Sequence, residues 1–246
     1  MSRPRVLPVL ALAVLALLSS CSGGGDTPLP TATVTAPAAT VTAEPTAAPT
    51  SAGCVPAGDG VPGGAQSITT LDLDGDGGDD QLWIADDGAD RTLGVTTASG
   101  ATFTHPIDLA GPAGATAFAL RPAPGDPGLV LLSDNRVADL LMVQGCALVA
   151  VTDAEGRPWQ FDLGFAGNGT GVGCVDLTGD GQPDLAGLNA DPDTGTVERT
   201  QITLTGTVAA AGTRDQVTPG AQDDTAHAIT CGDRTMDADG VREAQG

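Results

Sequence analysis

The chain has 246 residues, and 31 Asp and Glu residues against 10 basic residues give it a formal net charge of −21. All ten basic residues are arginine, and the lack of lysine excludes a Walker-type phosphate loop, a Schiff-base lysine and a Ser–Lys catalytic pair. The acidic excess argues against nucleic-acid binding, because it repels phosphate backbones. With 35 Gly, 18 Pro and no Tyr, the composition indicates a turn-rich chain with a core of Val, Leu, Ile and Ala rather than a helix bundle.

The first 20 residues have the features of a signal peptide. Arg3 and Arg5 precede an apolar run from Val6 to Leu18 that is too short to span a membrane as a helix. The run ends in Leu-Ser-Ser-Cys at 18–21, which resembles the lipobox of bacterial lipoprotein signals. The resemblance implies that Cys21 is lipidated, becomes the mature N-terminus and anchors the chain to the bacterial membrane on its extracytoplasmic side. The alternative is an ordinary secretory signal with a chance cysteine.

Residues 21–53 are predicted to be the lipidated cysteine followed by a disordered stalk. The segment consists almost entirely of Ser, Gly, Thr, Ala and Pro, and has too little apolar bulk to fold. Residues 54–246 remain as the folded domain, and their number suffices for one sizeable core.

The folded part contains similar segments at intervals of about 50 residues, a period typical of propellers and related arrays. Residues 71–82 and 175–186 are alike, residues 120–131 form a copy without the carboxylates, and a fourth partial copy starts at Thr230. Each copy predicts a strand, a Gly/Asp turn and further strands, with examples expected at 81–85, 128–132, 139–143, 147–151 and 201–208. We therefore expect an all-β fold, a small β-propeller-like array of about four repeats with the last one incomplete. Residues 54–65 can complete that repeat and close a ring; otherwise the array stays open or a partner chain finishes it.

Two aspartate-rich loops are the strongest chemical signal. Both fit the pattern D-x-[DT]-x-D-G-x-x-D, in which oxygens at positions 1, 3, 5 and 9 and a carbonyl at position 7 can surround one ion, while Gly at position 6 permits the turn. Hard oxygen donors suit Ca²⁺, and no His or thiolate favours zinc or copper. The expected ligands are Asp72, Asp74, Asp76, Gly78 and Asp80 in the first loop, and Asp176, Thr178, Asp180, Gln182 and Asp184 in the second.

These loops lack the Glu that an EF-hand needs at position 12, where Trp83 and Gly187 stand, and apolar strand residues follow at once. With residues 165–171 ahead of the second loop, the pattern resembles the FG-GAP/VCBS repeats of integrin alpha-chain propellers and many bacterial surface proteins. The resemblance implies that the loop aspartates bind calcium within a β-hairpin of a blade. The chain departs from that family in its metal-free repeat and in having too few repeats for a seven-bladed ring. A weaker third loop, Thr235 to Glu243, favours a polar tail over a metal site.

Besides Cys21, the chain has four cysteines, which suggest two disulfides with three possible connectivities. Cys174 and Cys231 occupy equivalent places in neighbouring repeats, which favours their pairing and leaves Cys54 with Cys146. Four free buried thiols are the alternative.

No catalytic motif survives inspection. Asp193-Thr194-Gly195 has no second copy, the glycines at 167–173 do not form a dinucleotide fingerprint, and neither histidine lies in a metalloprotease motif. We therefore expect a non-catalytic binding or adhesion module with an unidentified extracellular protein or glycan ligand. The alternatives are a wall- or glycan-directed hydrolase, for which Asp86, Asp87 and Asp90 are the nearest acidic cluster outside the loops, and a purely structural role in envelope assembly.

Overall fold

The computed structural model describes residues 53–88, 90–109, 111, 114–218 and 223–244. The chain divides into a unit of residues 1–46 and a unit of residues 47–246, and every described residue belongs to the second. The expected signal peptide, Cys21 and all of the stalk except Gly53 lie outside the described residues. The described part is all-β, as expected, and consists of several antiparallel sheets, none of which closes on itself.

The first sheet is a four-stranded antiparallel meander with its strands in chain order. Its strands are β1 (Gln66–Thr69), β2 (Gln81–Asp86), β3 (Arg91–Thr96) and β4 (Thr102–Pro106). The segment before β1 lies beside β4, where Ala57 forms a parallel bridge with Ala101. Residues 54–65 therefore extend the first sheet and do not complete a fourth repeat.

The middle sheet has the order β16-β5-β6-β7-β8, and β9 pairs with the other part of β7. Its strands are β5 (Thr116–Leu120), β6 (Leu129–Ser133), β7 (Val137–Val143), β8 (Leu148–Ala150), β9 (Gln160–Asp162) and β16 (Val241–Arg242). The third sheet is again a four-stranded antiparallel meander. Its strands are β10 (Gly171–Val175), β11 (Asp184–Ala190), β12 (Val197–Thr205) and β13 (Val208–Val217).

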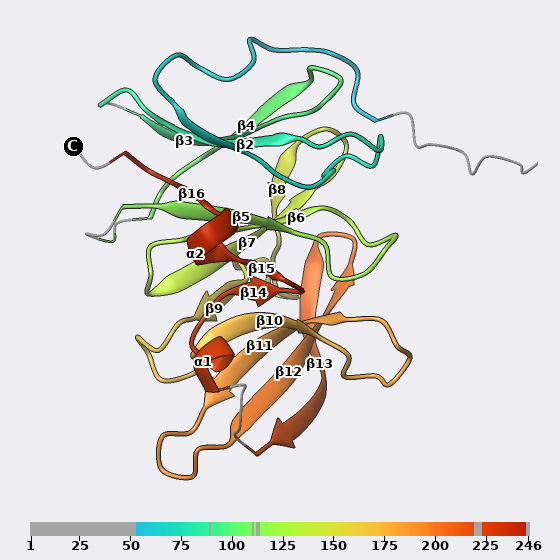
Figure 1. Ribbon diagram of the computed structural model, residues 1–246, viewed down its shortest axis with the longest axis vertical. Helices are drawn as coiled ribbons and strands as arrows, with labels where there is room; N and C mark the ends of the chain where they lie inside the picture. The colour runs from blue at the N-terminus through green and yellow to red at the C-terminus, as the bar shows by residue number, and fades with distance from the viewer. Residues whose placement is uncertain (1–52, 89, 110, 112–113, 219–222, 245–246) are drawn as a thin grey trace, which may run out of the picture. The chain divides into compact units, whose positions relative to one another are not determined.

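The middle sheet is buried on both faces, and Figure 1 shows it between the other two. Every residue of β5 and β6 is buried. Alternate residues of a strand point to opposite faces, so Ala117 and Ala119 pack with the first sheet while Phe118 and Leu120 pack with the third. A strand covered on both faces has no need of polar residues, which explains its continuous apolar run.

The C-terminal segment, residues 223–244, runs along the edges of the third and middle sheets (Figure 1). It contains α1 (Asp223–Ala226), β14 (Thr230–Cys231), β15 (Arg234–Thr235), α2 (Met236–Asp239) and β16. Ile229 forms a parallel bridge with Val172 of β10, and β16 pairs antiparallel with β5. The expected fourth repeat is thus a two-stranded hairpin and a strand added to the middle sheet, not another four-stranded sheet.

Four of the five expected strands are confirmed as β2, β6, β7 and β8, within shifts of one or two residues at their ends. The prediction of a single strand over 201–208 is wrong. β12 ends at Thr205, Gly206 adopts a left-handed φ of +58°, and β13 begins at Val208. The alternation of apolar and polar residues continues through this two-residue turn, so periodicity alone does not reveal the reversal.

Two disulfides are present, and the favoured pairing is confirmed. Cys54 bonds to Cys146, which ties the segment before β1 to the β7–β8 turn. Cys174 of β10 bonds to Cys231 of β14, which ties the third sheet to the C-terminal segment.

Candidate metal centre

The first aspartate loop, residues 70–80, connects β1 to β2 and brings three of its carboxylates together. One oxygen each from Asp72, Asp74 and Asp80 lies within 4.8 Å of the others. Leu73 lies between Asp72 and Asp74 in the sequence, and its side chain is buried in the core. It therefore anchors the loop, while its two neighbours face the centre of the turn. Among the described residues, this group of three could hold a metal ion.

Backbone hydrogen bonds fix the loop in this conformation. Asp72 accepts one from the N–H of Gly75 at 2.6 Å and one from the N–H of Gly77 at 2.9 Å. Both glycines have left-handed φ values, +84° and +90°, which residues with a Cβ rarely adopt. Since each carboxylate oxygen has more than one acceptor site, these bonds leave Asp72 able to contact a cation as well.

Asp80 is the buried member of the group. It is 0 % exposed, and its carboxylate accepts hydrogen bonds from the N–H of Leu73 at 2.7 Å and of Ala98 at 2.9 Å. Burial raises the pKa of Asp80 to about 6, the two backbone bonds oppose the rise, and the charges of Asp74 and Asp72 add to it. A cation at this position would offset both the burial and the repulsion, so the donor set fits a hard metal ion.

Segments distant in the sequence support the first loop, and these contacts were not predicted. The N–H of Cys54 donates to Asp74 at 2.7 Å, and the disulfide with Cys146 holds Cys54 in place. From the middle sheet, Arg121 donates a guanidinium hydrogen bond to the carbonyl of Asp72 at 2.7 Å. Arg121 belongs to the copy of the loop without carboxylates, at residues 120–131. Its position in the repeat next to the carboxylate-rich first loop is the only sequence feature that suggests this contact.

Asp76 does not join the group of three. Its carboxylate accepts a hydrogen bond from the N–H of Gly78 at 2.7 Å, so it caps the turn locally. Asp79 and Gly77 face solvent.

The second aspartate loop, residues 176–184, repeats the same hydrogen bonds without the same surroundings. Asp176 accepts from Gly179 at 2.6 Å and from Gly181 at 2.9 Å, which are the positions of Gly75 and Gly77. Asp184 accepts from the N–H of Leu177 at 2.9 Å, as Asp80 does from Leu73. The other expected ligands, Asp176, Thr178, Asp180 and Gln182, are exposed.

Asp184, at position 9 of the second loop, differs from Asp80 in its second hydrogen-bond partner. Gln201 of β12 donates its side-chain amide to Asp184 at 2.8 Å, whereas a backbone N–H serves Asp80. Asp184 is half-buried. Within the described residues, the structure records no hydrogen bond to the second loop from a backbone N–H that is distant in the sequence.

The weaker third candidate, Thr235 to Glu243, folds into α2 and the start of β16. Thr235 caps α2 by accepting from the N–H of Ala238 at 3.1 Å, and Asp237 pairs with Arg242 at 2.5 Å. Asp239 accepts from the N–H of Thr235. These oxygens serve a helix cap and ion pairs rather than a common centre.

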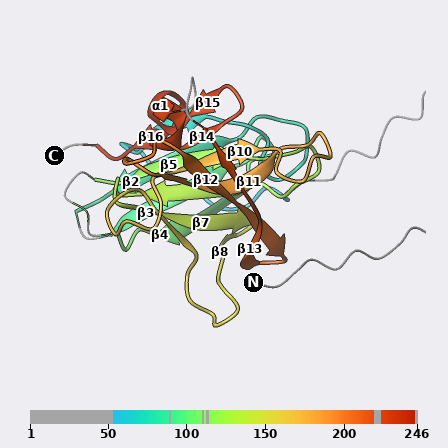
Figure 2. The same cartoon turned by 90° about the horizontal axis from the view of Figure 1, so that it is seen from below.

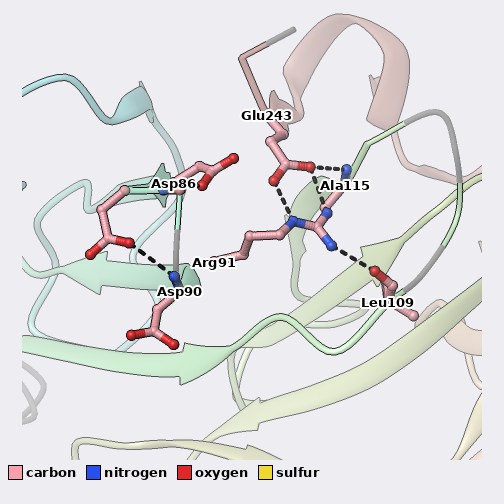
Figure 3. Close-up of polar contacts among 8 residues, drawn as sticks. Asp86, Asp90, Arg91, Leu109, Ala115 and Glu243 are labelled. Atoms are coloured by element: carbon pink, nitrogen blue, oxygen red, sulfur yellow. Dashed lines mark hydrogen bonds and ion pairs between the residues drawn. The ribbon is translucent and has the colours of Figure 1, made fainter. Parts of the chain in front are cut away.

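Glu243 instead joins the C-terminal segment to the first sheet (Figure 3). Its carboxylate accepts two hydrogen bonds from Arg91 of β3, at 2.5 and 2.6 Å, and one from the N–H of Ala115 at 2.7 Å. Arg91 also donates to the carbonyl of Leu109 at 2.6 Å. The hydrogen bonds from Arg91 hold the pKa of Glu243 below its ordinary value, so the pair is charged over a wide range of pH.

The acidic cluster at Asp86, Asp87 and Asp90 forms the turn between β2 and β3. Asp86 accepts from the N–H of Gly88 at 2.8 Å, and Asp87 accepts from the N–H of Asp90 at 2.9 Å (Figure 3 shows Asp86 and Asp90). These carboxylates therefore have the local capping role that is usual for aspartates in turns.

No protein-family model matches the chain, and no curated protein matches it. Among the helices of the described residues, none is both long enough and apolar enough to cross a membrane. The candidate centre therefore has to be interpreted from its own chemistry, which is that of three convergent carboxylates, one of them buried.

Proposed function

We propose that the chain is a cell-envelope lipoprotein, anchored to a bacterial membrane through Cys21, whose domain at 54–246 is a calcium-stabilised, non-catalytic binding or adhesion module. In this proposal the three stacked sheets form an open propeller-like array of FG-GAP/VCBS-type repeats. Calcium bound in the aspartate loops acts as a structural clip, and the stalk displays the array away from the lipid.

The observation that carries the proposal is the group of Asp72, Asp74 and Asp80. Three carboxylates within 4.8 Å, one of them fully buried, repel one another unless a cation or proton neutralises them. Calcium accepts six to eight oxygen ligands in flexible geometry, so carboxylates, the carbonyl of Gly78 and water would complete its shell. Two disulfides agree with a location outside the cytoplasm, where such bonds persist.

The experiment is a thermal melt of the full chain in EGTA, in calcium and in magnesium at equal ionic strength. We expect calcium to raise the melting temperature, and magnesium to raise it less, because magnesium demands a stricter octahedron. Identical melts in EGTA and calcium would overturn the calcium clip. Palmitate labelling of wild type and Cys21→Ser in a bacterial host tests the anchor separately, with label expected only in wild type.

The hydrolase alternative would need a perturbed carboxylate outside the loops, and Asp139 is such a group. Burial raises the pKa of Asp139, while a hydrogen bond from Gln160 at 2.6 Å opposes the rise. If the chain hydrolyses wall glycans and Asp139→Asn abolishes that activity, the proposed binding module would have to be replaced by the hydrolase alternative.

A further inference from the structure

Two hollows on the surface of the domain meet at Trp159. One, of about 630 Å³, lies beside the β8–β9 loop and is lined by Arg157, Trp159 and Gln160 among others. The second, of about 560 Å³, lies between β9 and the third sheet and is also lined by Trp159 and Gln160. Figure 2 shows the β8–β9 loop extending away from the sheets. The two hollows share these two residues, and together they are called the β9 cleft below.

The cleft gathers the accessible aromatic side chains of a chain that has few. Four of its six aromatic residues are buried in the domain: Trp83, Phe103, Phe118 and Phe161. The other two lie close together in sequence, Trp159 half-buried in the cleft and Phe165 67 % exposed at its rim beside Ala166, which lines it. Exposed aromatic area concentrated at one place is typical of a binding surface.

Phe165 and Trp159 are both held in position. Asp162 accepts hydrogen bonds from the N–H groups of Phe165 at 2.9 Å and Asn168 at 2.6 Å, which fixes the loop after β9. The guanidinium of Arg136 lies 4.9 Å from the centre of the Phe165 ring. Trp159 meets the edge of Phe161 with ring centres 6.5 Å apart and an interplanar angle of 74°. Aromatic rings fixed in this way lose little freedom when a ligand binds.

The floor of the cleft is polar where the same sheet face is otherwise apolar. Leu185 of β11 and Ile202 of β12 pack in the core against the middle sheet. Further along the same face, Asn189 and Thr200 line the cleft instead. No side-chain hydrogen bond from either of these two is recorded within the described residues. The third sheet thus changes from core to polar surface at the point where the middle sheet no longer covers it.

Gln160 does not contribute its amide to this surface. It alternates with Trp159 and Phe161 along the chain and therefore points to the opposite face of β9, where its amide nitrogen donates to Asp139 at 2.6 Å.

We propose that the β9 cleft binds a neutral, linear oligosaccharide, with a sugar ring against Trp159 and hydroxyl groups bonded to Asn189 and Thr200. The inference rests on the proposed binding module and names its ligand class. A pyranose presents an apolar C–H face that suits the negative face of an aromatic ring, and vicinal hydroxyls that match the paired donor and acceptor of an amide. The net charge of −21 disfavours polyanionic polymers.

The test uses intrinsic fluorescence of the full chain in calcium, titrated with the tetramers of β-1,4-N-acetylglucosamine, β-1,4-glucose and α-1,4-glucose, and with tetragalacturonate as the acidic probe. The chain has two tryptophans, and Trp83 is 2 % exposed, so changes in emission and in acrylamide quenching report Trp159. Calorimetry gives the affinities. We expect at least one neutral tetramer to bind and tetragalacturonate not to bind.

Four variants separate the loss of ligand contact from the loss of folding. Trp159→Ala should weaken binding at least about tenfold, and Asn189→Ala about threefold to tenfold. Thr203→Val is the control, because Thr203 lies on β12 but bonds to the carbonyl of Ala210 and does not line the cleft; its affinity should equal that of wild type. If Trp159→Ala fails to fold, Asn189→Ala and Thr200→Val carry the test, since both change half-buried side chains for which the structure records no side-chain hydrogen bond within the described residues.

The proposal is overturned if none of the three neutral tetramers binds at millimolar concentration, if binding is unchanged in Asn189→Ala and Thr200→Val, or if only tetragalacturonate binds. Failure here leaves the proposed function standing when calcium still stabilises the fold and Cys21 is still labelled, because neither readout involves the cleft. If calcium did not stabilise the fold and Cys21 were not labelled, while sugar still bound, the proposed function would be refuted and the sugar-binding cleft would stand.

Discussion

The first and second aspartate loops share one local design but differ in what surrounds them. In both, position 1 accepts from two glycine N–H groups and position 9 accepts from the residue at position 2. The first loop is enclosed by Cys54, the β3–β4 turn and Arg121, and its Asp80 is fully buried. The second loop is largely exposed. The motif alone therefore specifies the turn, while residues far away in sequence determine how strongly its carboxylates are desolvated.

The same contrast extends to the sheets that carry the loops. The first sheet is tied to both ends of the described chain, by Cys54 on one side and by the Arg91–Glu243 pair on the other. The ion pairs recorded within the third sheet, Arg199 with Asp215 and Arg214 with Glu198, join the neighbouring strands β12 and β13. Changes around the first loop should thus affect the whole domain, and matched changes around the second should stay local.

The largest effect is expected from Cys54→Ser with Cys146→Ser. The bond closes a separation of 92 residues, so its loss should cost about 4 kcal/mol of unfolding free energy, and freeing Cys54 should also weaken calcium binding by the first loop. Cys174→Ser with Cys231→Ser is the matched control, with a separation of 57 residues. It should cost a similar free energy and leave that affinity unchanged. Urea unfolding and calcium titration measure both; equal losses of affinity in the two variants would refute the distinction.

Asp80→Ala should destabilise the domain by about 3 kcal/mol, because it leaves the N–H groups of Leu73 and Ala98 without their buried acceptor. Asp184→Ala, at the equivalent but more exposed position, should cost about 1 kcal/mol. Unfolding in urea at saturating calcium compares them. Equal costs would mean that burial of the first loop has no energetic consequence.

Glu243→Gln should cost about 2 kcal/mol at pH 7, since it removes one partner of a mostly buried ion pair. Asp215→Asn should cost less, because Asp215 is 39 % exposed. Arg91 lowers the pKa of Glu243 below its ordinary 4.5, so the pair stabilises the fold above that value and the stabilisation is lost as the pH falls through the lowered pKa. Urea unfolding from pH 7 to pH 3 should therefore show wild type and Glu243→Gln converging at the acid end. A constant gap would contradict this.

The smallest effect is expected from calcium itself in the open second loop. At roughly 1 mM calcium and a Kd of about 0.1 mM, one site adds about 1.4 kcal/mol, and the exposed loop should gain less than the enclosed one. Melting of Asp80→Ala in calcium and EGTA isolates the second loop, and melting of Asp184→Ala isolates the first. If calcium raised the melting temperature of Asp80→Ala more than that of Asp184→Ala, the second loop would gain more stability from calcium than the first, contrary to this prediction.

The sequence predicted the local features of the fold well, because these depend on residues close together in the chain. The Gly-Asp pattern predicted both loops and the strands that follow them, and the turn predicted for the copy at 120–131 is present, with Gly125 at φ +96° in the structure. Equivalent repeat positions predicted the pairing of Cys174 with Cys231.

Features that depend on tertiary contacts were not predictable. Nothing local to Glu243 indicates that it pairs with Arg91, 152 residues away, or that the C-terminal segment adds β16 to the middle sheet in place of a fourth repeat. The grouping of Asp72, Asp74 and Asp80 without Asp76 also follows from neighbours, since Cys54 and Ala98 orient the first loop from outside it.

The most direct test of the account is calorimetric titration of calcium into the full chain and into Asp74→Asn, which changes an expected ligand that is only half-buried. We predict saturable binding in wild type at sub-millimolar to millimolar concentration, with the tighter of its sites lost in Asp74→Asn. Absence of calcium binding in wild type, or an unchanged isotherm in Asp74→Asn, would contradict a metal centre in the first aspartate loop.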